Sequence, residues 1–243
     1  MDQSADIFVP SLLHLRVTRQ FDCAYRPGYS EKRLAADLTH FPHFHDMLAE
    51  AGFRRVENWV YRPACDACQS CIPFRVKASS FQHSRNTRRI LRRNADLVRG
   101  LADQPLGEEY YQLFQDYLDS RHNDGHMAQM DIGEFTTMIL NSPIATSLVE
   151  YRDQEGRLQA CVLVDLQRDG LSAVYSFFNS ERAGQSTGHF LILDMIDQVC
   201  AAGLDWLYLG FYVSESPKMS YKARYLPAEI FVDGSWQDFS APK

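Results

Sequence analysis

The sequence of 243 residues contains no apolar run that approaches the roughly 20 residues needed to cross a bilayer. Its first residues, MDQSADIFVPSL, lack the basic and then apolar order of a signal peptide. Internal repeats, low-complexity tracts and long linkers are also missing. These absences argue against a membrane, secreted or repeat protein, and we expect a soluble protein of the cytoplasm.

The composition supports neither a disordered chain nor one held together by disulfide bonds. Hydrophobic residues make up 45 % of the chain, which is typical of a protein with a substantial core. The chain has 6 cysteines, but thiols stay reduced in the cytoplasm, so a disulfide framework is not expected. The cysteines therefore need another explanation.

Cys65, Cys68 and Cys71 form a C-x2-C-x2-C run, and Cys23 lies upstream in the segment DCAYRPG. Three thiols from one tight run and one from a distance, with a proline soon after the third, are typical of iron–sulfur ligation. Zinc more often takes two separated pairs. Free structural thiols are the alternative to a metal site.

Positive charge is unevenly distributed along this acidic chain. The net charge is −6, yet the segment from Arg75 to Arg99 contains Asp96 as its only acidic residue. One basic segment on an acidic protein indicates a local contact with a polyanion rather than a general coating of nucleic acid. The basic residues of the segment are Arg75, Lys77, Arg85, Arg88, Arg89, Arg92, Arg93 and Arg99.

The run SRNTRRILRRN predicts a basic amphipathic helix, with Ser84 or Asn86 as its N-cap. At the helical period the arginines through Arg99 share one face, and the apolar residues through Leu101 share the other. Asn94 falls on the apolar side, so it must bond a neighbouring loop or distort the helix end. Because guanidinium groups bind phosphates in a bidentate manner, we expect a phosphate-binding surface; a solvated charged face is the alternative. Its residues are Arg85, Arg88, Arg89 and Arg92, with Arg93 as a weaker candidate.

The C-terminal half predicts an α+β fold. Residues 145–151, 158–166 and 171–178 have strand patterns, residues 187–202 form an apolar helix that ends at Gly203, and residues 206–213 form another strand. This order is that of acetyltransferase-like acyl-group transferases, with a mainly antiparallel sheet around a central helix. The joint DQPLGEE predicts an N-terminal domain of residues 1–102, with the cysteines and the basic helix, and a catalytic domain of residues 103–243.

Six runs of the sequence together resemble the arginyl-tRNA–protein transferase family, and within it the compact bacterial branch of aspartate/glutamate leucyltransferases. The resemblance extends from about Phe21 to Trp236. The runs are FDCAYRPG, YRPACDACQSCIPFRV, SRNTRRILRRN, YLDSRHNDGHM, LSAVYSFFN and KMSYKARYLPAEI. Six motifs in one order are far more specific than any one of them.

The resemblance implies an enzyme of the N-degron pathway. It would transfer leucine from leucyl-tRNA to the α-amine of proteins that begin with Asp or Glu, and so mark them for degradation. The partners would be the aminoacyl-tRNA and these proteins, with no membrane and no DNA. Transfer would require no cofactor, but eukaryotic relatives imply an iron–sulfur cluster or zinc, whose ligands here would be Cys23, Cys65, Cys68 and Cys71.

The donor is an activated ester, so orientation and stabilisation of an oxyanion should contribute most of the rate. The backbone amides near Ser186 and Gly188, at the start of the predicted central helix, suit an oxyanion or a phosphate. His122 is the candidate for a titrating group. Arg85, Arg88, Arg89 and Arg92 would bind the phosphates of the tRNA acceptor stem.

Two kinds of side chain are candidates for substrate binding. Basic residues would bind the acidic acceptor, and Lys218 and Lys222, four residues apart, would share a helix face. Tyrosines would stack on the terminal adenosine or contact the leucine. The candidates are Tyr61, Arg62, Arg75, Tyr175, Tyr208, Lys218, Tyr221 and Lys222.

Three other functions compete with leucyl transfer. Arginine is an alternative transferred residue. An acyl-CoA-dependent N-acetyltransferase would carry a glycine-rich Q/R-x-x-G-x-G/A run before the central helix, which GQSTGH meets only partly. The third alternative is a non-enzymatic, metal-clipped RNA-binding module.

Overall fold

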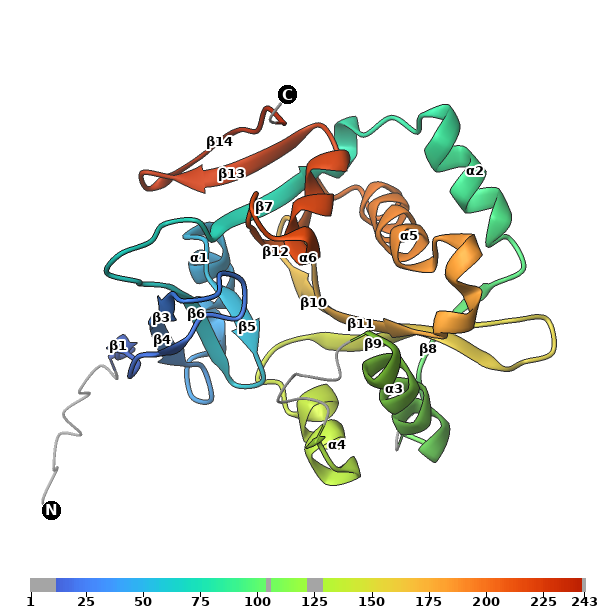
Figure 1. Cartoon of the computed structure of the whole chain (residues 1–243), viewed down its shortest axis with the longest axis horizontal. Helices are drawn as coiled ribbons and strands as arrows, with labels where there is room; N and C mark the ends of the chain where they lie inside the picture. Colours follow the sequence, from blue (N-terminus) through green and yellow to red (C-terminus); the bar gives the residue numbers. More distant parts are fainter. Residues whose placement is uncertain (1–11, 104–105, 122–128, 242–243) are drawn as a thin grey trace, which may run out of the picture.

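The structure is a computed structural model that describes residues 12–103, 106–121 and 129–241. Its largest sheet has eight strands in the order β14-β13-β7-β12-β11-β10-β9-β8, all antiparallel except the pair β11 and β12 (Figure 1). The strands are β7 (Ile72–Lys77), β8 (Val98–Leu101), β9 (Thr146–Arg152), β10 (Leu158–Gln167), β11 (Gly170–Phe178), β12 (Trp206–Tyr212), β13 (Ala228–Val232) and β14 (Ser235–Asp238).

Helices cover both faces of this sheet (Figure 1). On one face lie α2 (Arg85–Arg93) and the central helix α5 (Thr187–Ala201), and on the other lie α3 (Glu108–Arg121) and α4 (Ile132–Leu140). Apolar side chains from each pair of helices and from the sheet form two separate cores. The predicted α+β fold, with a mainly antiparallel sheet around a central helix, is therefore confirmed.

A smaller sheet precedes the large one, in the order β1-β4-β6-β5. It packs with α1 around a small apolar core of its own. The elements of this region are β1 (Arg16–Val17), β2 (Phe21–Asp22), β3 (Ser30–Glu31), β4 (Arg33–Asp37), η1 (Pro42–Phe44), α1 (His45–Glu50), β5 (Arg54–Val56) and β6 (Trp59–Pro63).

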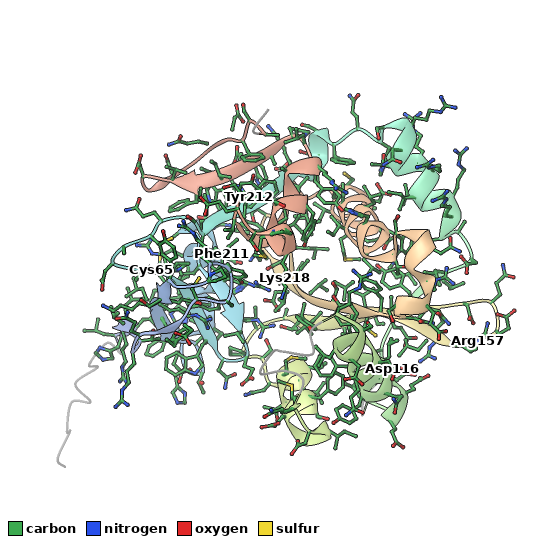
Figure 2. All side chains as sticks on the ribbon, viewed as in Figure 1. Cys65, Asp116, Arg157, Phe211, Tyr212 and Lys218 are labelled. Atoms are coloured by element: carbon green, nitrogen blue, oxygen red, sulfur yellow. The ribbon has the colours of Figure 1, made fainter. Side chains whose placement is uncertain are left out.

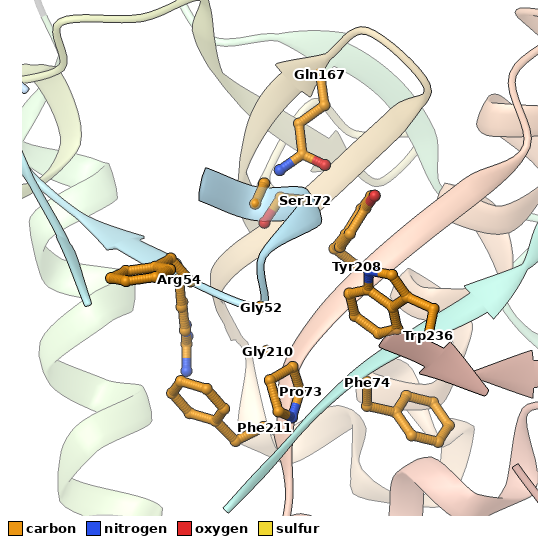
Figure 3. A pocket seen from close by; sticks show the side chains of 12 residues that line it. Gly52, Arg54, Pro73, Phe74, Gln167, Ser172, Tyr208, Gly210, Phe211 and Trp236 are labelled. Carbon is orange, nitrogen blue, oxygen red and sulfur yellow. The ribbon is translucent and has the colours of Figure 1, made fainter. Parts of the chain in front are cut away.

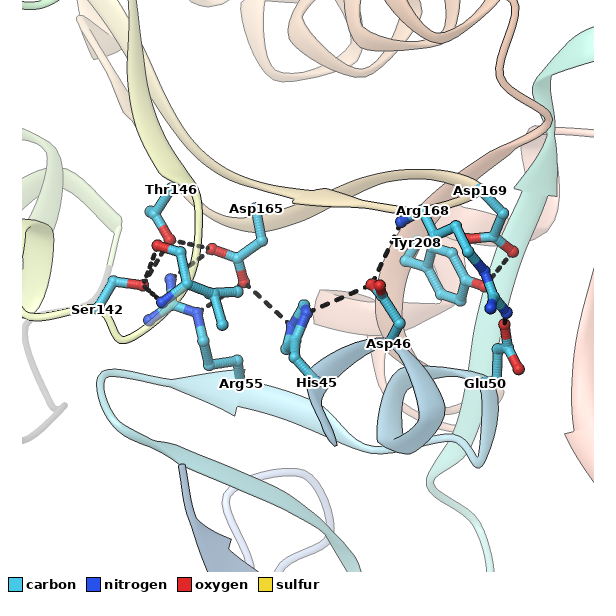
Figure 4. A network of polar contacts seen from close by, with 11 residues as sticks. His45, Asp46, Glu50, Arg55, Ser142, Thr146, Asp165, Arg168, Asp169 and Tyr208 are labelled. Atoms are coloured by element: carbon cyan, nitrogen blue, oxygen red, sulfur yellow. Dashed lines mark hydrogen bonds and ion pairs between the residues drawn. The ribbon is translucent and has the colours of Figure 1, made fainter. Parts of the chain in front are cut away.

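A buried polar network joins the two sheets (Figure 4). Arg55 of β5 donates two hydrogen bonds, of 2.7 and 2.6 Å, to the carboxylate of Asp165 in β10, and both side chains are buried. Thr146 donates a further hydrogen bond to Asp165. A bidentate arginine–carboxylate pair fixes direction as well as distance, so the network holds the small sheet in a defined position against the large one.

The predicted order of three strands, a helix and a strand is confirmed by β9, β10, β11, α5 and β12. The domain division after residue 102 stays a prediction. It does not separate the sheets, because β7 and β8 precede it and yet pair with strands that follow it. Among the described residues, no helix combines the length and apolarity that a bilayer crossing requires.

The basic helix is shorter than predicted. Ser84 caps α2 by accepting a hydrogen bond from the backbone of Thr87, as expected, but the helix ends at Arg93. Asn94 is fully buried and donates hydrogen bonds to the carbonyls of Ile90 and Gln185. It therefore both ends the helix and bonds a neighbouring segment, η4 (Ser180–Gln185), and the chain continues into strand β8 instead of a further helical turn.

Candidate active site

The two parallel strands at the centre of the large sheet separate along their length. Residues 170–172 of β11 pair with residues 206–208 of β12, and no pairing follows. Gly170 makes the close end of the pair possible, because a β-carbon there would collide with the carbonyl oxygen of Trp206. Beyond this point the strands diverge and leave room for side chains and ligands.

Two adjacent cavities occupy this gap, and together they form the cleft of the candidate site. The inner cavity has about 180 Å³, and the mouth has about 590 Å³. The cavities are neighbours, because four residues line both: Tyr117, Ser176, Ile192 and Tyr221. The cleft is formed by α3, β11, α5, β12 and the short helices α6 (Pro217–Ser220) and η5 (Tyr221–Arg224).

The cleft is cationic although the chain carries a net charge of −6. Neither cavity is lined by an aspartate or a glutamate of the described chain. Such a lining attracts anionic ligands and repels cationic ones. The basic residues that line it are Arg54, Arg121, His189, Lys218 and Lys222.

Two of these basic residues belong to the inner cavity. Lys222 is 3 % exposed, and its ammonium donates to the carbonyl of Phe211 and lies 3.7 Å from the sulfur of Met219. Arg54 donates to the carbonyl of Val174. Burial lowers the pKa of Lys222 well below its ordinary value of 10.5, and the charge of Arg54 lowers it further. The remaining walls are mostly apolar, so a bound carboxylate would find two poorly compensated cations.

Arg54 reaches the cleft from the small sheet and passes Gly210 of β12 (Figure 3). Gly210 has a φ of 73°, and a β-carbon at this position would lie 3.2 Å from the Arg54 side chain. Glycine therefore serves the backbone conformation and also leaves space for the guanidinium.

The N-terminus of α5 lies at the mouth. Ser186 has a left-handed backbone with φ of 58°, and its side chain makes no capping hydrogen bond. Thr187 is 2 % exposed and lines the mouth, and its hydroxyl has no hydrogen-bond partner among the described residues. The free amides of a helix N-terminus carry partial positive charge and suit an oxyanion or a phosphate. Ser186 and Gly188 both line the mouth, and their catalytic function stays a prediction.

The arginines of α2 are all exposed, and none has an ion pair within the described chain. Figure 2 shows side chains projecting from the outer side of this helix. The last turn of α2 contacts η4, which leads directly into the mouth: the side chain of Asn94 donates to the Gln185 carbonyl at 2.9 Å. Segment η4 therefore connects α2, with its basic face, to the mouth of the cleft. This face consists of Arg85, Arg88, Arg89, Arg92 and Arg93.

Four of the predicted substrate residues line neither cavity. Arg75 bonds Glu229 and Tyr208, and its guanidinium lies 3.8 Å from the centre of the Trp206 ring. The Tyr208 hydroxyl in turn donates to Asp169, so both Arg75 and Tyr208 have partners within the protein, and substrate binding by them stays a prediction. The remaining two, Tyr61 and Arg62, lie on β6 outside the cleft.

Among the other predicted residues, Lys218 and Tyr221 line the mouth, and Tyr175, Tyr221 and Lys222 line the inner cavity. Lys218 is exposed and Lys222 is buried, so they do not share a helix face, because the helix type changes between them from α6 to η5. His122 lies outside the described residues.

The four cysteines of the predicted metal site occupy one region, beside β2 and β7. Burial, and then the neighbouring thiol of Cys23, raise the pKa of Cys71 to about 12. Thiolates suit iron and zinc. However, no three His, Cys, Asp or Glu side chains in the described ranges have the arrangement of a metal site. The described geometry does not fit the metal, and metal binding stays a prediction.

Three basic residues of the cleft were absent from the sequence prediction: Arg54, Arg121 and His189. Arg121 belongs to one of the family-like runs and His189 follows Gly188 directly, so the motifs around them offered a signal. Arg54 had none. Its hydrogen bond joins it to Val174, 120 residues away, which no local pattern encodes.

The structure combines an acetyltransferase-like strand order with a cationic cleft between the two parallel strands. Two family models match the chain: the N-terminal part of arginine-tRNA-protein transferase over residues 21–89 and its C-terminal part over residues 109–232. The chain belongs to the arginine-tRNA-protein transferase family.

Relatives extend the match over nearly the whole chain. An aspartate/glutamate leucyltransferase of Maricaulis maris is 41 % identical, covering 91 % of this chain and 88 % of the relative. Proteins of the same name are 40 % identical in Afipia carboxidovorans, with 92 % and 94 % covered, and 41 % identical in Paracoccus denitrificans, with 96 % and 88 % covered.

Solved structures are more distant. L-PGS from Bacillus licheniformis matches with a TM-score of 0.48 and 13 % identity, over 70 % of this chain and 49 % of that chain. A GCN5-related glucosamine N-acetyltransferase region of a fungal β-N-acetylglucosaminidase matches with a TM-score of 0.43 and 8 % identity, over 81 % and 22 %. These scores are too low to carry a functional argument.

Proposed function

We propose that this protein transfers leucine from leucyl-tRNA to the α-amine of proteins whose first residue is Asp or Glu. The observation that supports this best is the cationic cleft, which has no carboxylate in its described lining and is connected through η4 to α2, whose arginines are exposed. Both substrates bring negative charge to it: the RNA through its phosphates and the acceptor through its side chain.

In the reaction, the nitrogen of the acceptor's α-amine attacks the ester carbonyl of leucyl-tRNA and forms a C–N bond. The ester C–O bond breaks, the amine loses a proton, and the ribose oxygen of the tRNA gains one. The amides at the start of α5 can stabilise the oxyanion that forms on the carbonyl oxygen. The walls of the cleft hold amine and ester together, which lowers the entropic part of the barrier.

The two substrates occupy different parts of the cleft and meet where these parts adjoin. The arginines of α2 bind acceptor-stem phosphates, and the mouth receives the esterified end of the RNA with its leucine against Phe178, Ile192 and Pro217. The inner cavity receives the acidic side chain of the acceptor, which pairs with Arg54 and Lys222. This arrangement places the α-amine at the junction of the two cavities.

Leucine, rather than arginine, suits the cleft as the donor residue. An arginyl group in the mouth would bring a guanidinium beside Arg121 and Lys218, without a carboxylate in the described lining to pair with. Juxtaposed like charges cost roughly several kcal/mol. A leucyl group meets apolar walls and no repulsion.

A donor assay tests the proposal. The protein is incubated with radiolabelled leucyl-tRNA, arginyl-tRNA or acetyl-CoA and with peptides that begin with Asp, Glu, Lys or Ala. We expect label from leucyl-tRNA on the Asp and Glu peptides alone. Incorporation from arginyl-tRNA would reject the choice of donor, incorporation from acetyl-CoA alone would identify an acetyltransferase, and no incorporation from any donor would favour an RNA-binding module.

A further inference from the structure

His189 is the histidine of the described chain that lines the cleft. It is the third residue of α5, directly after the helix N-terminus that faces the mouth. Its Nδ1 lies 2.5 Å from the hydroxyl of Tyr225, and its Nε2 lies 3.2 Å from a guanidinium nitrogen of Arg224. Both ring nitrogens therefore have identified partners, and these partners define the state of the imidazole.

The protonation of the ring follows from its partners. Arginine nitrogens only donate hydrogen bonds, so Nε2 must accept and carries a lone pair. A neutral imidazole has one N–H, which therefore lies on Nδ1 and donates to the oxygen of Tyr225. The ring of Tyr221 packs edge-on against the imidazole, with 6.2 Å between the centres. His189 is thus a neutral base with a fixed tautomer.

The charged surroundings keep the imidazole neutral. Burial lowers the pKa of His189, and Arg224 lowers it further. The neighbouring groups that can carry charge are Tyr221, Arg224 and Tyr225 around η5, Lys218 of α6, and Tyr117 and Arg121 of α3. None is a carboxylate, so nothing in the described lining favours an imidazolium.

We propose that the acceptor's α-amine attacks the leucyl ester in its neutral form, that Nε2 of His189 accepts the proton that this nitrogen then loses, and that Tyr225 holds the ring in the required tautomer. This inference rests on the proposed transfer reaction. As the C–N bond forms, one N–H proton passes to Nε2. As the ester C–O bond breaks, the same proton passes to the ribose oxygen, and the imidazole returns to its neutral state.

Arg224 controls access to the base. It is exposed, and in the described chain its guanidinium donates to Nε2 and forms no ion pair. The anionic end of the RNA can draw this exposed side chain to a phosphate, which frees Nε2 for the amine. His189 is then available when the donor is bound.

The test is the single-turnover rate of transfer to an Asp peptide at saturating leucyl-tRNA. His189→Gln is expected to lower this rate about 100-fold, the lower end of general-base effects, because part of the amine is already neutral. Leucyl-tRNA affinity should not change. His43→Gln, at an exposed histidine of η1 far from the cleft, is the matched control and should keep the full rate.

Two further variants distinguish a base from a structural residue. Arg224→Gln removes a charge that lowers the pKa of His189 in the protein without RNA, so the acidic limb of the pH profile of kcat/KM for leucyl-tRNA should move to higher pH. His189→Gly should regain rate on addition of imidazole, which a packing defect would not. A loss below about threefold in His189→Gln would overturn the inference, as would an unmoved limb or absent rescue. Failure of the unmodified protein to transfer leucine would instead reject the proposed function.

Discussion

Arg54 of β5 and Lys222 of η5 line the same inner cavity, and each donates a hydrogen bond to a backbone carbonyl rather than to a carboxylate. Burial normally requires that a charge be paired. Arg54 and Lys222 would therefore gain a charged partner only when an anion enters the cavity. In the proposed reaction, this anion is the acidic side chain of the acceptor.

The first prediction concerns acceptor selectivity. Arg54→Gln and Lys222→Met should each lower the preference for an Asp peptide over an Asn peptide, because each removes a charged hydrogen bond worth about 1.5–3 kcal/mol, or about 10- to 150-fold in kcat/KM. Competition assays with both peptides measure the ratio. Arg157→Gln, in the turn after β9, is the matched control. An unchanged ratio in both cavity variants would place the acidic side chain elsewhere.

The second prediction concerns stability and pH. Lys222→Met should increase the free energy of unfolding by about 1–4 kcal/mol at neutral pH, because an apolar side chain replaces a buried charge. The folded pKa of Lys222 lies below 10.5, so between these values the unfolded chain binds more protons than the folded one. The gain should be constant below the lowered pKa, shrink as the pH rises above it, and vanish near pH 10.5.

Urea unfolding at a series of pH values measures this gain. Lys218→Met is the matched comparison, since Lys218 is exposed and its replacement should change the free energy of unfolding little at any pH. A gain of equal size at neutral and at alkaline pH would show that burial does not lower the pKa of Lys222.

The third prediction concerns the basic face of α2. Replacing Arg88 and Arg89 by Glu should weaken tRNA binding and reduce the slope of log affinity against log salt by about 0.7–0.9 per lost phosphate contact. Filter binding or fluorescence anisotropy at several salt concentrations gives both values. Replacing Arg157 and Arg168 by Glu is the control, because these two exposed arginines lie outside the basic face. Affinity and slope should then stay unchanged. Equal affinity and slope in the α2 variant would reduce this face to a solvated surface.

The fourth prediction concerns the cysteine cluster. A hydrogen bond from Ser70 lowers the pKa of Cys68, and Arg26 supports this, whereas burial raises the pKa of Cys71 to about 12. In metal-free protein at neutral pH, Cys68 should therefore react with iodoacetamide first and Cys71 last, because the thiolate is the nucleophile. Mass spectrometry of partly alkylated protein gives the order.

Metal binding by the same cysteines is decided by anaerobic purification followed by iron and zinc analysis. Bound metal should protect all four thiols from alkylation. Full activity without either metal would leave the cysteines as structural thiols.

Periodicity predicted the elements whose apolar residues repeat over several turns or strands. The β9–β10–β11 meander, α5 and β12 agree with the structure within one or two residues. Periodicity failed at the end of α2, where Leu97, Val98 and Leu101 continue a helical pattern but lead into or lie in a strand. The hydrogen bond from Asn94 to Gln185 ends this helix, and it depends on a segment that arrives about ninety residues later in the chain.

The residues of the candidate site also fall into those that local sequence predicts and those that only the fold brings together. Lys218, Tyr221 and Gly188 lie in local motifs and could be predicted. Arg75 also lies in such a motif, but cross-strand partners satisfy it. Arg54 belongs to a different sheet from the strands it approaches, and only the assembled fold brings it to the cleft.

Strand β7 lies between β12 and β13 in the large sheet, although it precedes α2 in the chain. A fragment that begins after α2 would contain most of the cleft but would expose two unsatisfied strand edges at its centre, which favours aggregation. The cleft can therefore be transplanted only together with β7, and any truncated version must begin before Ile72.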